Sequence, residues 1–582
     1  MISATKEKLA SYFQGNSQFV VPFFQRSYVW DVDNWAAFWD HVVSVEERYQ
    51  ADKSGEHFIG TIIAKRSEDT GKLGEATYEL IDGQQRLTTV ALFLKAISDA
   101  SSGQLPRLKE KVSEHLQFRD AHDKLFPRVV LNGYDRKYYE AVISGDYSGL
   151  PEKKDHKIIA AYEFFRKNLD GFPDERLDQL RLVILERVPL ISMMLAPEDD
   201  EQEIFDTINA LGVRLTTAEL LKNYIFKEEE LRSSYETLWR DVFEDSEEHV
   251  DFWNAEKTAG RVIRTNLEVL LYCYLIIKTG KPDVKLEKLF KEYKQWLQNR
   301  TPQDKKAFLE ELGSYAEIYA SFPSGPDLNQ IRFQEQEKRF FHLLENLSVT
   351  TAYPPVLYIY RNVSDHQTRD AMLGTLESYL VRRNVCRLTT KNYNLLFIQM
   401  ANKLKEALKA DGAINAESLA SIIRDYTEDT NRMPSDAEFE TAFGSQRLSN
   451  QNAREILFVV ALCQVSTGLA DVPKLSLGNY SVEHMMPVKW HANWMDREMN
   501  DLEMAERDRK LKTLGNLTLV TKRLNSKMQN AAWSVKKRVL RDNSSLPMTV
   551  SYVDAEKWDE AAIQQRGLDL FDVAKRVWPL GS

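Results

Sequence analysis

Cysteine is scarce in this sequence, and the few cysteines that occur form no short motif. Only three are present among 582 residues, at positions 273, 386 and 463, and no CxxC pair exists. A disulfide framework and a zinc site built from thiolates are therefore not expected, and a reducing compartment fits this usage best.

Long apolar runs are missing as well. One of the longest, LEVLLYCYLII at 267–277, falls well short of the roughly 18 apolar residues that a membrane helix needs. The opening stretch, MISATKEKLASYFQ, lacks the apolar core of a signal peptide. These absences predict a cytoplasmic protein.

No GxxxxGK(S/T) motif occurs, which excludes a P-loop protein, and no short-period repeat is visible. Net positive charge is also lacking, since 77 Lys and Arg residues stand against 87 Asp and Glu residues, a formal net charge of −10. Taken alone, this charge argues weakly against a nucleic-acid partner.

What the sequence does contain is enough apolar material for more than one core. Hydrophobic residues make up 43% of the 582 residues, and a chain of this length exceeds the size at which single cores stop growing. Strand-like runs and helical patterns mix over 1–230, helical patterns dominate 231–440, and mixed structure returns over 441–582. We therefore expect a mostly helical α+β protein of three domains with these boundaries.

The clearest local patterns lie near the start. The runs QFVVPFF (18–24), TIIAKR (61–66) and TYELIDG (77–83) predict strands, and RLTTVALFLKAIS (86–98) predicts a helix.

Near the other end, SVEHMMPVKW (481–490) places Glu483 directly before His484 and a proline three residues after it. Asn516 follows in LGNLTLV, which predicts a strand, and Asn525 in RLNSKMQN, where a helix is expected to begin. A strand with His, a strand with Asn and a helix with Asn are the parts of the ββα-metal fold of HNH nucleases. The bland alternative is a histidine at a strand edge with two asparagines as turn and cap residues.

Hydrolysis of a phosphodiester explains why these residue types would occur together. The reaction needs a base to activate water and a divalent ion to stabilise the charge that develops on the phosphate. Oxygen ligands from Glu and Asn side chains suit Mg²⁺ or Mn²⁺. On these grounds we expect Glu483 and His484 to be catalytic.

Charge gives an independent test, because the region 509–541 reverses the acidic average. It contains ten Lys or Arg residues and no Asp or Glu. A solvated helix face would more often interleave both signs, whereas a surface facing phosphates would not. The residues expected to contact DNA are Lys522, Arg523, Lys527, Lys536 and Lys537.

A second constellation lies in LIDGQQRLTT (80–89), where a strand runs into Asp82-Gly83 and a helix is expected to open at Gln84. Helix N-termini bind anions through their unpaired N–H groups. Arg86 can add charge-assisted contacts to phosphate, and Asp82 can hold a magnesium ion. The alternative is an ordinary Asp-Gly turn followed by surface residues of a helix.

These motifs together resemble a known family along nearly the whole chain. VPFFQRSYVW, HFIGTII, IDGQQRLTT and EIFDTINALGVRLTTAELLKNYIF are similar to the GmrS-type domain, and ESYLVRRNVCRLTT is similar to its helical continuation. VEHMMP, LGNLTLV and LNSKMQN are similar to the GmrD-type HNH domain. Both in one polypeptide resemble the fused GmrSD-like type IV, or modification-dependent, restriction enzymes.

The resemblance implies a fold and a set of roles. It implies a ParB/sulfiredoxin-like N-domain that binds and hydrolyses nucleotide, a helical middle region, and a C-terminal metal-dependent HNH domain that nicks or cuts DNA. His484 would be the general base, Glu483 and Asn525 metal ligands, and Asn516 would orient the loop or the base. The residues around the nucleotide phosphates would be Gln25, Arg26, Asp82, Gly83, Gln84, Gln85 and Arg86.

The expected cofactors are Mg²⁺ or Mn²⁺ and a nucleoside triphosphate, either GTP or ATP. The expected partners are DNA, modified phage DNA in particular, and the nucleotide, with no membrane; a homodimer is left open. Defence against phage follows from the resemblance. The alternative function is a nucleotide-gated DNA sensor or clamp whose HNH part grips DNA without cutting it.

Overall fold

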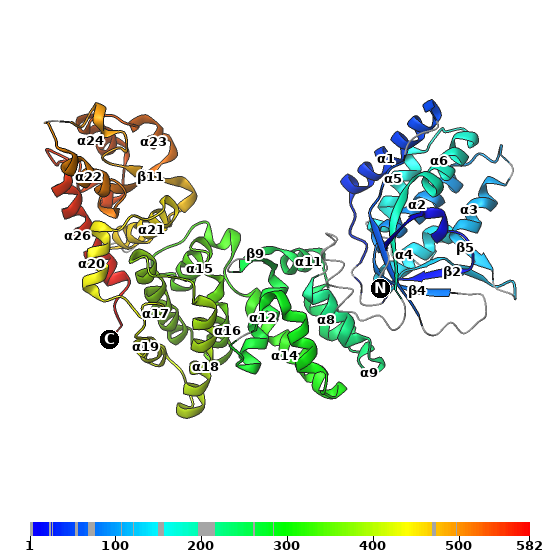
Figure 1. The fold of residues 1–582 in the computed structure, drawn as a ribbon, viewed down its shortest axis with the longest axis horizontal. Helices are drawn as coiled ribbons and strands as arrows, with labels where there is room; N and C mark the ends of the chain where they lie inside the picture. The colour runs from blue at the N-terminus through cyan, green and yellow to red at the C-terminus, as the bar shows by residue number, and fades with distance from the viewer. Residues whose placement is uncertain are drawn as a thin grey trace. The chain divides into compact units, whose positions relative to one another are not determined.

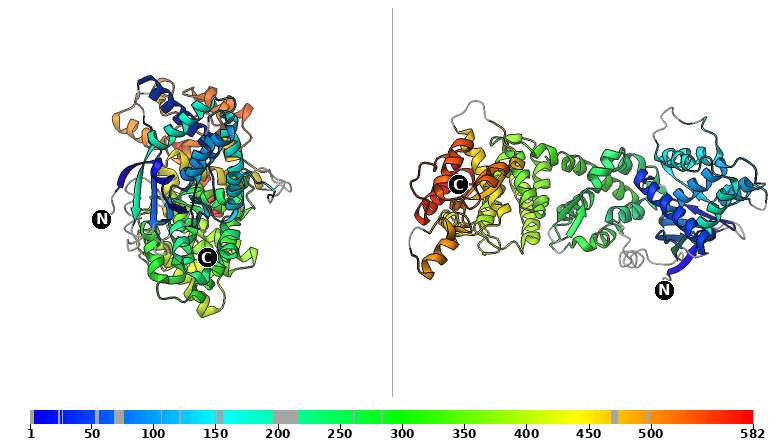
Figure 2. Two further views of the ribbon diagram at one scale, coloured as in Figure 1. Left: turned by 90° about the vertical axis from the view of Figure 1, so that its right-hand side faces the viewer. Right: turned by 90° about the horizontal axis from the view of Figure 1, so that it is seen from above.

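The computed structural model of the chain describes residues 4–22, 25, 27–52, 56–67, 76–105, 107–119, 122–148, 150, 156–195, 216–259, 262–282, 284–467, 473–495 and 498–581. The chain forms two compact units, Met1–Tyr235 and Glu236–Ser582. Most of the elements are helices, as Figures 1 and 2 show, so the mostly helical α+β class is confirmed. Within the described ranges, no helix is long and apolar enough to cross a membrane.

The first unit is built on a six-stranded mixed sheet. In spatial order its strands are β1 (Ala4–Lys8), β8 (Pro189–Leu195), β3 (Thr61–Arg66), β4 (Ala76–Asp82), β2 (Ser17–Val20) and β7 (Val129–Val130). Strand β3 is parallel to β8, and β2 is parallel to β4 and β7, whereas β1 pairs with β8 and β3 with β4 in antiparallel fashion.

The strands predicted at 61–66 and 77–83 are confirmed to within one residue. The strand predicted at 18–24 ends earlier, at Val20, just before Pro22, which has no N–H to donate to a sheet.

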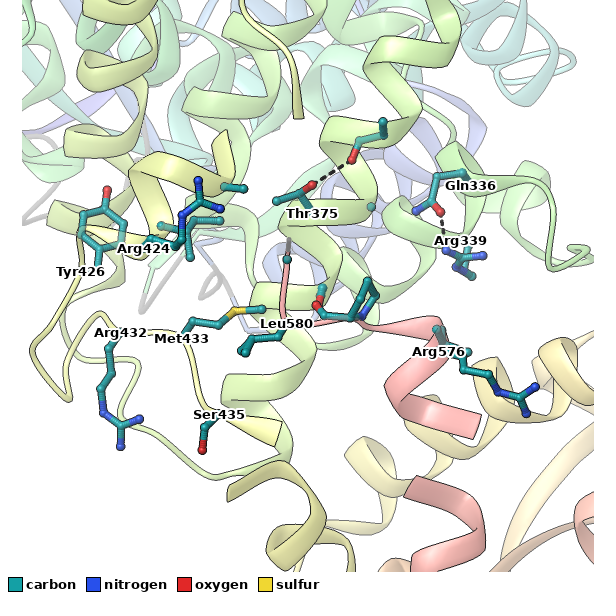
Figure 3. Close-up of a pocket in the computed structure, with 18 of the residues that line it drawn as sticks. Gln336, Arg339, Thr375, Arg424, Tyr426, Arg432, Met433, Ser435, Arg576 and Leu580 are labelled. Atoms are coloured by element: carbon teal, nitrogen blue, oxygen red, sulfur yellow. Dashed lines mark hydrogen bonds between the residues drawn. The ribbon is translucent and has the colours of Figure 1, made fainter. Parts of the chain in front are cut away.

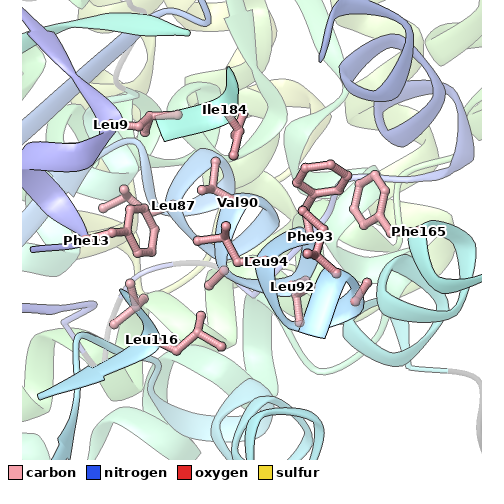
Figure 4. Packing of buried hydrophobic residues seen from close by; sticks show 14 of the residues in the cluster. Leu9, Phe13, Leu87, Val90, Leu92, Phe93, Leu94, Leu116, Phe165 and Ile184 are labelled. Atoms are coloured by element: carbon pink, nitrogen blue, oxygen red, sulfur yellow. The ribbon is translucent and has the colours of Figure 1, made fainter. Parts of the chain in front are cut away.

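Helix α2 (Gln84–Ala100) forms the centre of this unit's core. It packs against the helices α3 (Leu108–Leu116), α4 (Gly133–Ser144), α5 (Lys157–Asn168) and α6 (Asp174–Arg187), and α1 (Val32–Asp52) packs against α5 and α6. Leu87, Val90 and Phe93 of α2 are completely buried there, as Figure 4 shows. The short strands β5 (Gln117–Arg119) and β6 (Leu125–Pro127) form a separate pair, and α8 (Thr217–Phe226) and α9 (Glu229–Arg232) follow.

Strand β3 shows why its apolar residues at 62–64 are consecutive rather than alternating. Ile62 and Ala64 face the core around α2, while Ile63 packs on the opposite face with Met193 and Leu195 of β8. A strand that is buried on both faces needs apolar residues at every position.

The second unit opens with a long series of helices and one two-stranded pair. The elements are α10 (Asp241–Phe243), α11 (Glu247–Asn254), β9 (Glu256–Ala259), β10 (Val262–Thr265), α12 (Asn266–Thr279), α13 (Leu289–Leu297), α14 (Pro302–Ala320), α15 (Gln336–Asn346), α16 (Tyr353–Asn362), α17 (His366–Val385), α18 (Tyr393–Asp411), α19 (Ala416–Arg424), α20 (Asp436–Ser445) and α21 (Asn450–Ser466). Capping boxes begin α12, at Thr265 and Glu268, and α14, at Thr301 and Asp304.

The remainder of this unit returns to mixed structure. Its elements are β11 (Tyr480–His484), α22 (Asp501–Lys510), β12 (Leu517–Thr521), α23 (Lys522–Met528), α24 (Trp533–Asn543), α25 (Pro547–Val550) and α26 (Glu560–Val577). One core joins α20 and α21 to β12 and α26, so this region and the preceding helices share their buried residues. Position 441, the predicted start of a third domain, falls inside α20. The division into three domains stays a prediction.

Candidate functional site

The motif around Glu483 and His484 lies on two antiparallel strands followed directly by a helix. Strand β11 ends at His484, and its partner β12 places Thr518 opposite Glu483 and Leu517 opposite His484. Helix α23 begins immediately after β12, and the hydroxyl of Thr521 accepts a bond from the N–H of Leu524 at its start. The predicted order of strand, strand and helix is present.

Asn516 is the most completely bonded side chain of this motif. Its Oδ1 accepts hydrogen bonds from Met486 N at 2.8 Å and Trp558 Nε1 at 3.0 Å. Its Nδ2 donates to Met486 O at 2.8 Å and Leu511 O at 2.9 Å. An amide side chain offers two donors and two acceptor lone pairs, so Asn516 has none left for a substrate. Asn516 therefore fixes the loop that follows β11, in keeping with the orienting role that the family resemblance implies.

Glu483 is buried, and a lysine from a distant part of the chain lies on it. Lys536 Nζ is 2.5 Å from Glu483 Oε1 and 2.8 Å from the carbonyl oxygen of His484. Burial raises the pKa of Glu483 and lowers the pKa of Lys536, and the opposite charge of each partner counteracts this. Because Lys536 is 0% exposed, the prediction that it contacts DNA is wrong: its ammonium group faces inward, to Glu483.

His484 has the properties of a proton acceptor. Burial, followed by the positive charges of Lys536 and Lys512, lowers its pKa to about 4, so the imidazole is neutral at neutral pH. Its Nε2 is buried and has no hydrogen-bond partner among the described residues. A buried polar atom without a partner costs free energy, so this nitrogen has capacity left for a hydrogen bond with water or a substrate.

Few side chains here offer ligand atoms for a divalent ion, and these atoms are oxygens. Asn525 on α23 donates from Nδ2 to Ser481 Oγ at 3.1 Å and to Val482 O at 3.2 Å. Ser481 shares a strand face with Glu483, two residues on, so Asn525 reaches the strand beside this carboxylate. Within the described ranges, no group of three or more His, Cys, Asp or Glu side chains could hold a metal. The fit rests on Glu483, whose carboxylate already binds a cation, the Lys536 ammonium group.

The basic residues nearby point mostly to solvent. Lys522, Arg523 and Lys527 on α23 are exposed and Lys537 on α24 is half-buried. None of these four forms an ion pair with a carboxylate in the part of the chain that the structure describes. Their charges are therefore available to a polyanion, in contrast to Lys536.

In the first unit, the Asp82 to Arg86 motif forms the predicted junction between a strand and a helix. Strand β4 ends at Asp82, Gly83 has φ +98°, and α2 begins at Gln84. A Cβ at Gly83 would lie 2.7 Å from Ile62 Cγ1, so both the backbone conformation and the space require glycine. The first N–H groups of α2 thus open at the end of a sheet strand.

Arg86 is bonded to the main chain of β3 and of the residues just before it. Its Nε donates to Ile59 O at 2.9 Å and its Nη1 to Thr61 O at 3.0 Å, with Asp82 Oδ2 at 3.5 Å. Gly60 makes this possible, because a Cβ there, at φ +111°, would lie 2.7 Å from Arg86 Nε.

The glutamines of this motif hold the segment before α1. Gln85 accepts a hydrogen bond from Val29 N at 2.9 Å and donates to Ser27 O at 3.2 Å. Gln25 donates to Ile81 O at 3.3 Å, and Gln84 is buried. The structure therefore brings Gln25 and residues 82–86 together, whereas Arg26 lies outside the described residues.

Sequence patterns gave no indication of Arg566, which supports the site around Glu483 and His484. Arg566 on α26 is completely buried and donates to the carbonyl oxygens of Leu514, Gly515 and Leu517, at 3.1, 2.9 and 2.8 Å. A Cβ at Gly515 would lie 2.1 Å from Ile563 O, so α26 presses directly on the turn before β12. A single arginine in an amphipathic helix gives no sequence signal for such a role.

A separate pocket of about 760 Å³ lies among the helices of the second unit. Figure 3 shows its arginines, which include Arg339, Arg424 and Arg432. These three are paired with carboxylates: Arg339 with Glu377, Arg424 with Glu417, and Arg432 with Glu438 and Asp429. Since its charges are largely balanced, the pocket is not assigned a ligand.

Comparison with protein families gives two matches in this chain. Residues 9–226 match the family described as the GmrSD restriction endonuclease, N-terminal domain, and residues 433–573 match the C-terminal domain of GmrSD restriction endonucleases. The first match contains the Asp82 to Arg86 motif and the second contains Glu483, His484, Asn516 and Asn525. No curated protein matches the chain in a sequence search.

Proposed function

The chain belongs to the GmrSD family of type IV restriction endonucleases, and from this premise we propose that it is a nucleotide-regulated, metal-dependent nuclease that nicks or cleaves modified phage DNA. The observation that carries the proposal is the neutral His484, whose buried Nε2 lacks a partner in the described structure, beside the carboxylate of Glu483. Two antiparallel strands and a helix, in the order of an HNH domain, support the same assignment.

Each residue of the second site then has a distinct task. His484 takes the proton of the attacking water, and Asn516 fixes the loop that follows it. Glu483 and Asn525 would hold Mg²⁺ or Mn²⁺, which supplies stabilisation of the charge that develops on the phosphate. Lys522, Arg523, Lys527 and Lys537 bind the DNA backbone, because their charges are not neutralised by carboxylates in the described structure.

The first unit would bind and hydrolyse a nucleoside triphosphate, GTP or ATP. Two observations support this: the start of α2 directly follows a sheet strand, and Arg86 is held there by carbonyl oxygens of β3 and the residues before it. A helix N-terminus with a fixed guanidinium group is suited to phosphate. Nucleotide would regulate cutting through a difference in affinity between two states of the enzyme.

The decisive experiment incubates the full chain with plasmid DNA and with DNA that carries modified bases, in the presence of Mg²⁺. Each reaction is run without nucleotide, with GTP and with ATP. We expect metal-dependent nicks or breaks in the modified DNA at a rate that changes with nucleotide. DNA that is retained in a gel shift but never cut under any of these conditions would contradict the proposal and favour the sensor or clamp.

A further inference from the structure

The cation on Glu483 is part of the protein itself. Lys536 comes from α24, and its Nζ contacts both Glu483 Oε1 and the carbonyl oxygen of His484. Its side chain is 1% exposed and that of Glu483 is 9% exposed. The ammonium group therefore binds the strand end at the two residues that the proposed nuclease function uses.

Removal of either charge alone would leave the other one buried and unpaired, so burial keeps the two side chains together. A buried carboxylate without a partner is costly, and truncation of one member of a buried ion pair strongly destabilises a protein. A cation is thus required on Glu483 in any stable state in which it is ionised. A divalent ion with oxygen ligands meets the same requirement with twice the charge.

Lysine is also the basic residue best suited to be replaced on a carboxylate by a metal ion. Its ammonium group is a compact charge on a flexible stem of four carbons, whereas the planar guanidinium of arginine would bind a carboxylate through two parallel hydrogen bonds. One other buried carboxylate of the same unit, Glu377, is held by an arginine: it pairs with Arg339 at 3.0 Å. At Glu483 the chain uses lysine instead.

We propose that Lys536 is a built-in competitor for the divalent ion of the nuclease site: it occupies Glu483 in the metal-free enzyme, and metal binding requires its ammonium group to leave. This inference rests on the proposed metal dependence and adds a regulatory step to it. The metal-free site is neutral and stable, and the metal must displace a resident charge before the site can form.

The test measures metal binding directly, without DNA and without a cleavage assay. The full chain is titrated with Mn²⁺ at pH 8 by calorimetry, as the wild type and as Lys536→Met. We expect the variant to bind one Mn²⁺ at least about tenfold more tightly, because close charge pairs couple by more than the 1.4 kcal/mol that corresponds to a factor of ten. Arg538→Met, which removes an exposed cation two residues further along α24, should bind as the wild type does.

Thermal unfolding gives a second readout. Without metal, Lys536→Met should melt at a lower temperature than the wild type, and Mn²⁺ should raise its Tm by more than it raises that of the wild type. Glu483→Gln combined with Lys536→Met should recover stability and lose the response to Mn²⁺. If Lys536→Met does not fold, Lys536→Gln, which keeps donors for Glu483 and His484 O, carries the same expectations.

The outcomes separate this inference from the proposed function. Equal or weaker Mn²⁺ binding by the Lys536 variants, with clear binding by the wild type, overturns the exchange while metal dependence stands. Failure of both wild type and variants to bind Mn²⁺ at this site overturns both. Binding by the variants that is tighter than that of the wild type, and lost with Glu483→Gln, supports the exchange.

Discussion

The two sites of this chain treat their polar groups in opposite ways. Around Asp82 to Arg86, the side chains are anchored to main-chain atoms, as Arg86 is to Ile59 O and Thr61 O. Around His484, a ring nitrogen is buried without a partner in the described structure, and a carboxylate is neutralised by a single lysine. The first arrangement fixes its side chains in place, whereas the second leaves a buried ring nitrogen unbonded in the described structure and a buried carboxylate with a single charged partner.

The two regions also differ in how they obtain their cores. The sheet of the first unit encloses its own apolar cluster around α2, with its members drawn from residues 9–190. The region around β11 and β12 shares a core with helices that begin well before it, since Ile331, Val381 and Phe443 belong to the same cluster as Leu519. We therefore expect the nuclease region to depend on the helices that precede it.

The largest expected effect is on DNA cleavage and concerns the site around His484. His484→Ala removes the proposed general base and should reduce DNA cleavage by a factor on the order of 10²–10⁴. Nucleotide hydrolysis and DNA binding should change little. The measurement is single-turnover nicking of plasmid DNA.

His491→Ala is the matched control for this variant. His491 is exposed and stacks on Trp490, with ring centroids 4.0 Å apart, in the same part of the unit. It should cleave at the normal rate. A His484→Ala enzyme that keeps more than half of the wild-type rate would remove His484 from the mechanism.

The second prediction concerns the loop that presents His484. Asn516→Ala leaves Met486, Leu511 and Trp558 with unpaired buried groups and should lower the free energy of unfolding by about 2–5 kcal/mol. Chemical unfolding of the full chain measures this. Asn543→Ala, on the exposed end of α24, should change stability by less than about 0.5 kcal/mol. Equal effects of the two substitutions would contradict the positioning role.

The third prediction tests the site around Asp82 to Arg86, where side chains are bonded to main-chain atoms. Arg86→Ala should slow nucleotide hydrolysis about tenfold or more, because a charge-assisted hydrogen bond contributes about 1.5–3 kcal/mol. The unit should stay folded, since Arg86 is a partly exposed side chain. Arg66→Ala, at the exposed end of β3, is the control. Normal hydrolysis of GTP and ATP by Arg86→Ala would place the nucleotide site elsewhere.

The smallest expected effect concerns how the stability of the first unit depends on pH. Burial raises the pKa of Asp174, but bonds from Leu105 N, Ser102 N and the hydroxyls of Ser101 and Ser102 outweigh this and lower it to about 2. Because the folded-state pKa lies below the ordinary value, Asp174 stabilises the first unit above about pH 4 and loses this contribution as the pH falls towards 2.

The measurement for Asp174 is urea unfolding of the wild type and Asp174→Asn at several pH values. The variant should be less stable at pH 6, and the difference should shrink by pH 3. A difference that does not depend on pH would mean that the carboxylate charge is not what these bonds stabilise.

Local patterns predicted β2, β3, β4, β11, β12 and the position of both motifs, because β-branched runs, Gly83 and the order from Glu483 to Asn525 are visible along the chain. They did not predict which residues contact one another in the tertiary structure. Lys536 belongs to a basic run and looked like a DNA contact, yet the fold brings it onto Glu483, a residue 53 positions away. Charge patterning identifies a basic segment but not which of its members is buried.

The same limit applies to Asn516 and Arg566. Asn516 was identified by its place after Gly515, but its complete set of hydrogen bonds depends on Trp558 and Leu511, which only the tertiary structure places beside it. Arg566 was missed, because the carbonyl oxygens of Leu514 and Gly515 that accept from it lie 52 and 51 residues earlier and carry no side-chain signature.

The position of Arg566 has a consequence for how the enzyme is made. During translation the first unit emerges from the ribosome before any part of the nuclease motif, whereas Arg566, which grips the turn before β12, emerges after all of the other residues of that motif. A nascent chain that stops short of α26 lacks this grip on Leu514, Gly515 and Leu517. The turn before β12 is therefore held in this way only once α26 has been made.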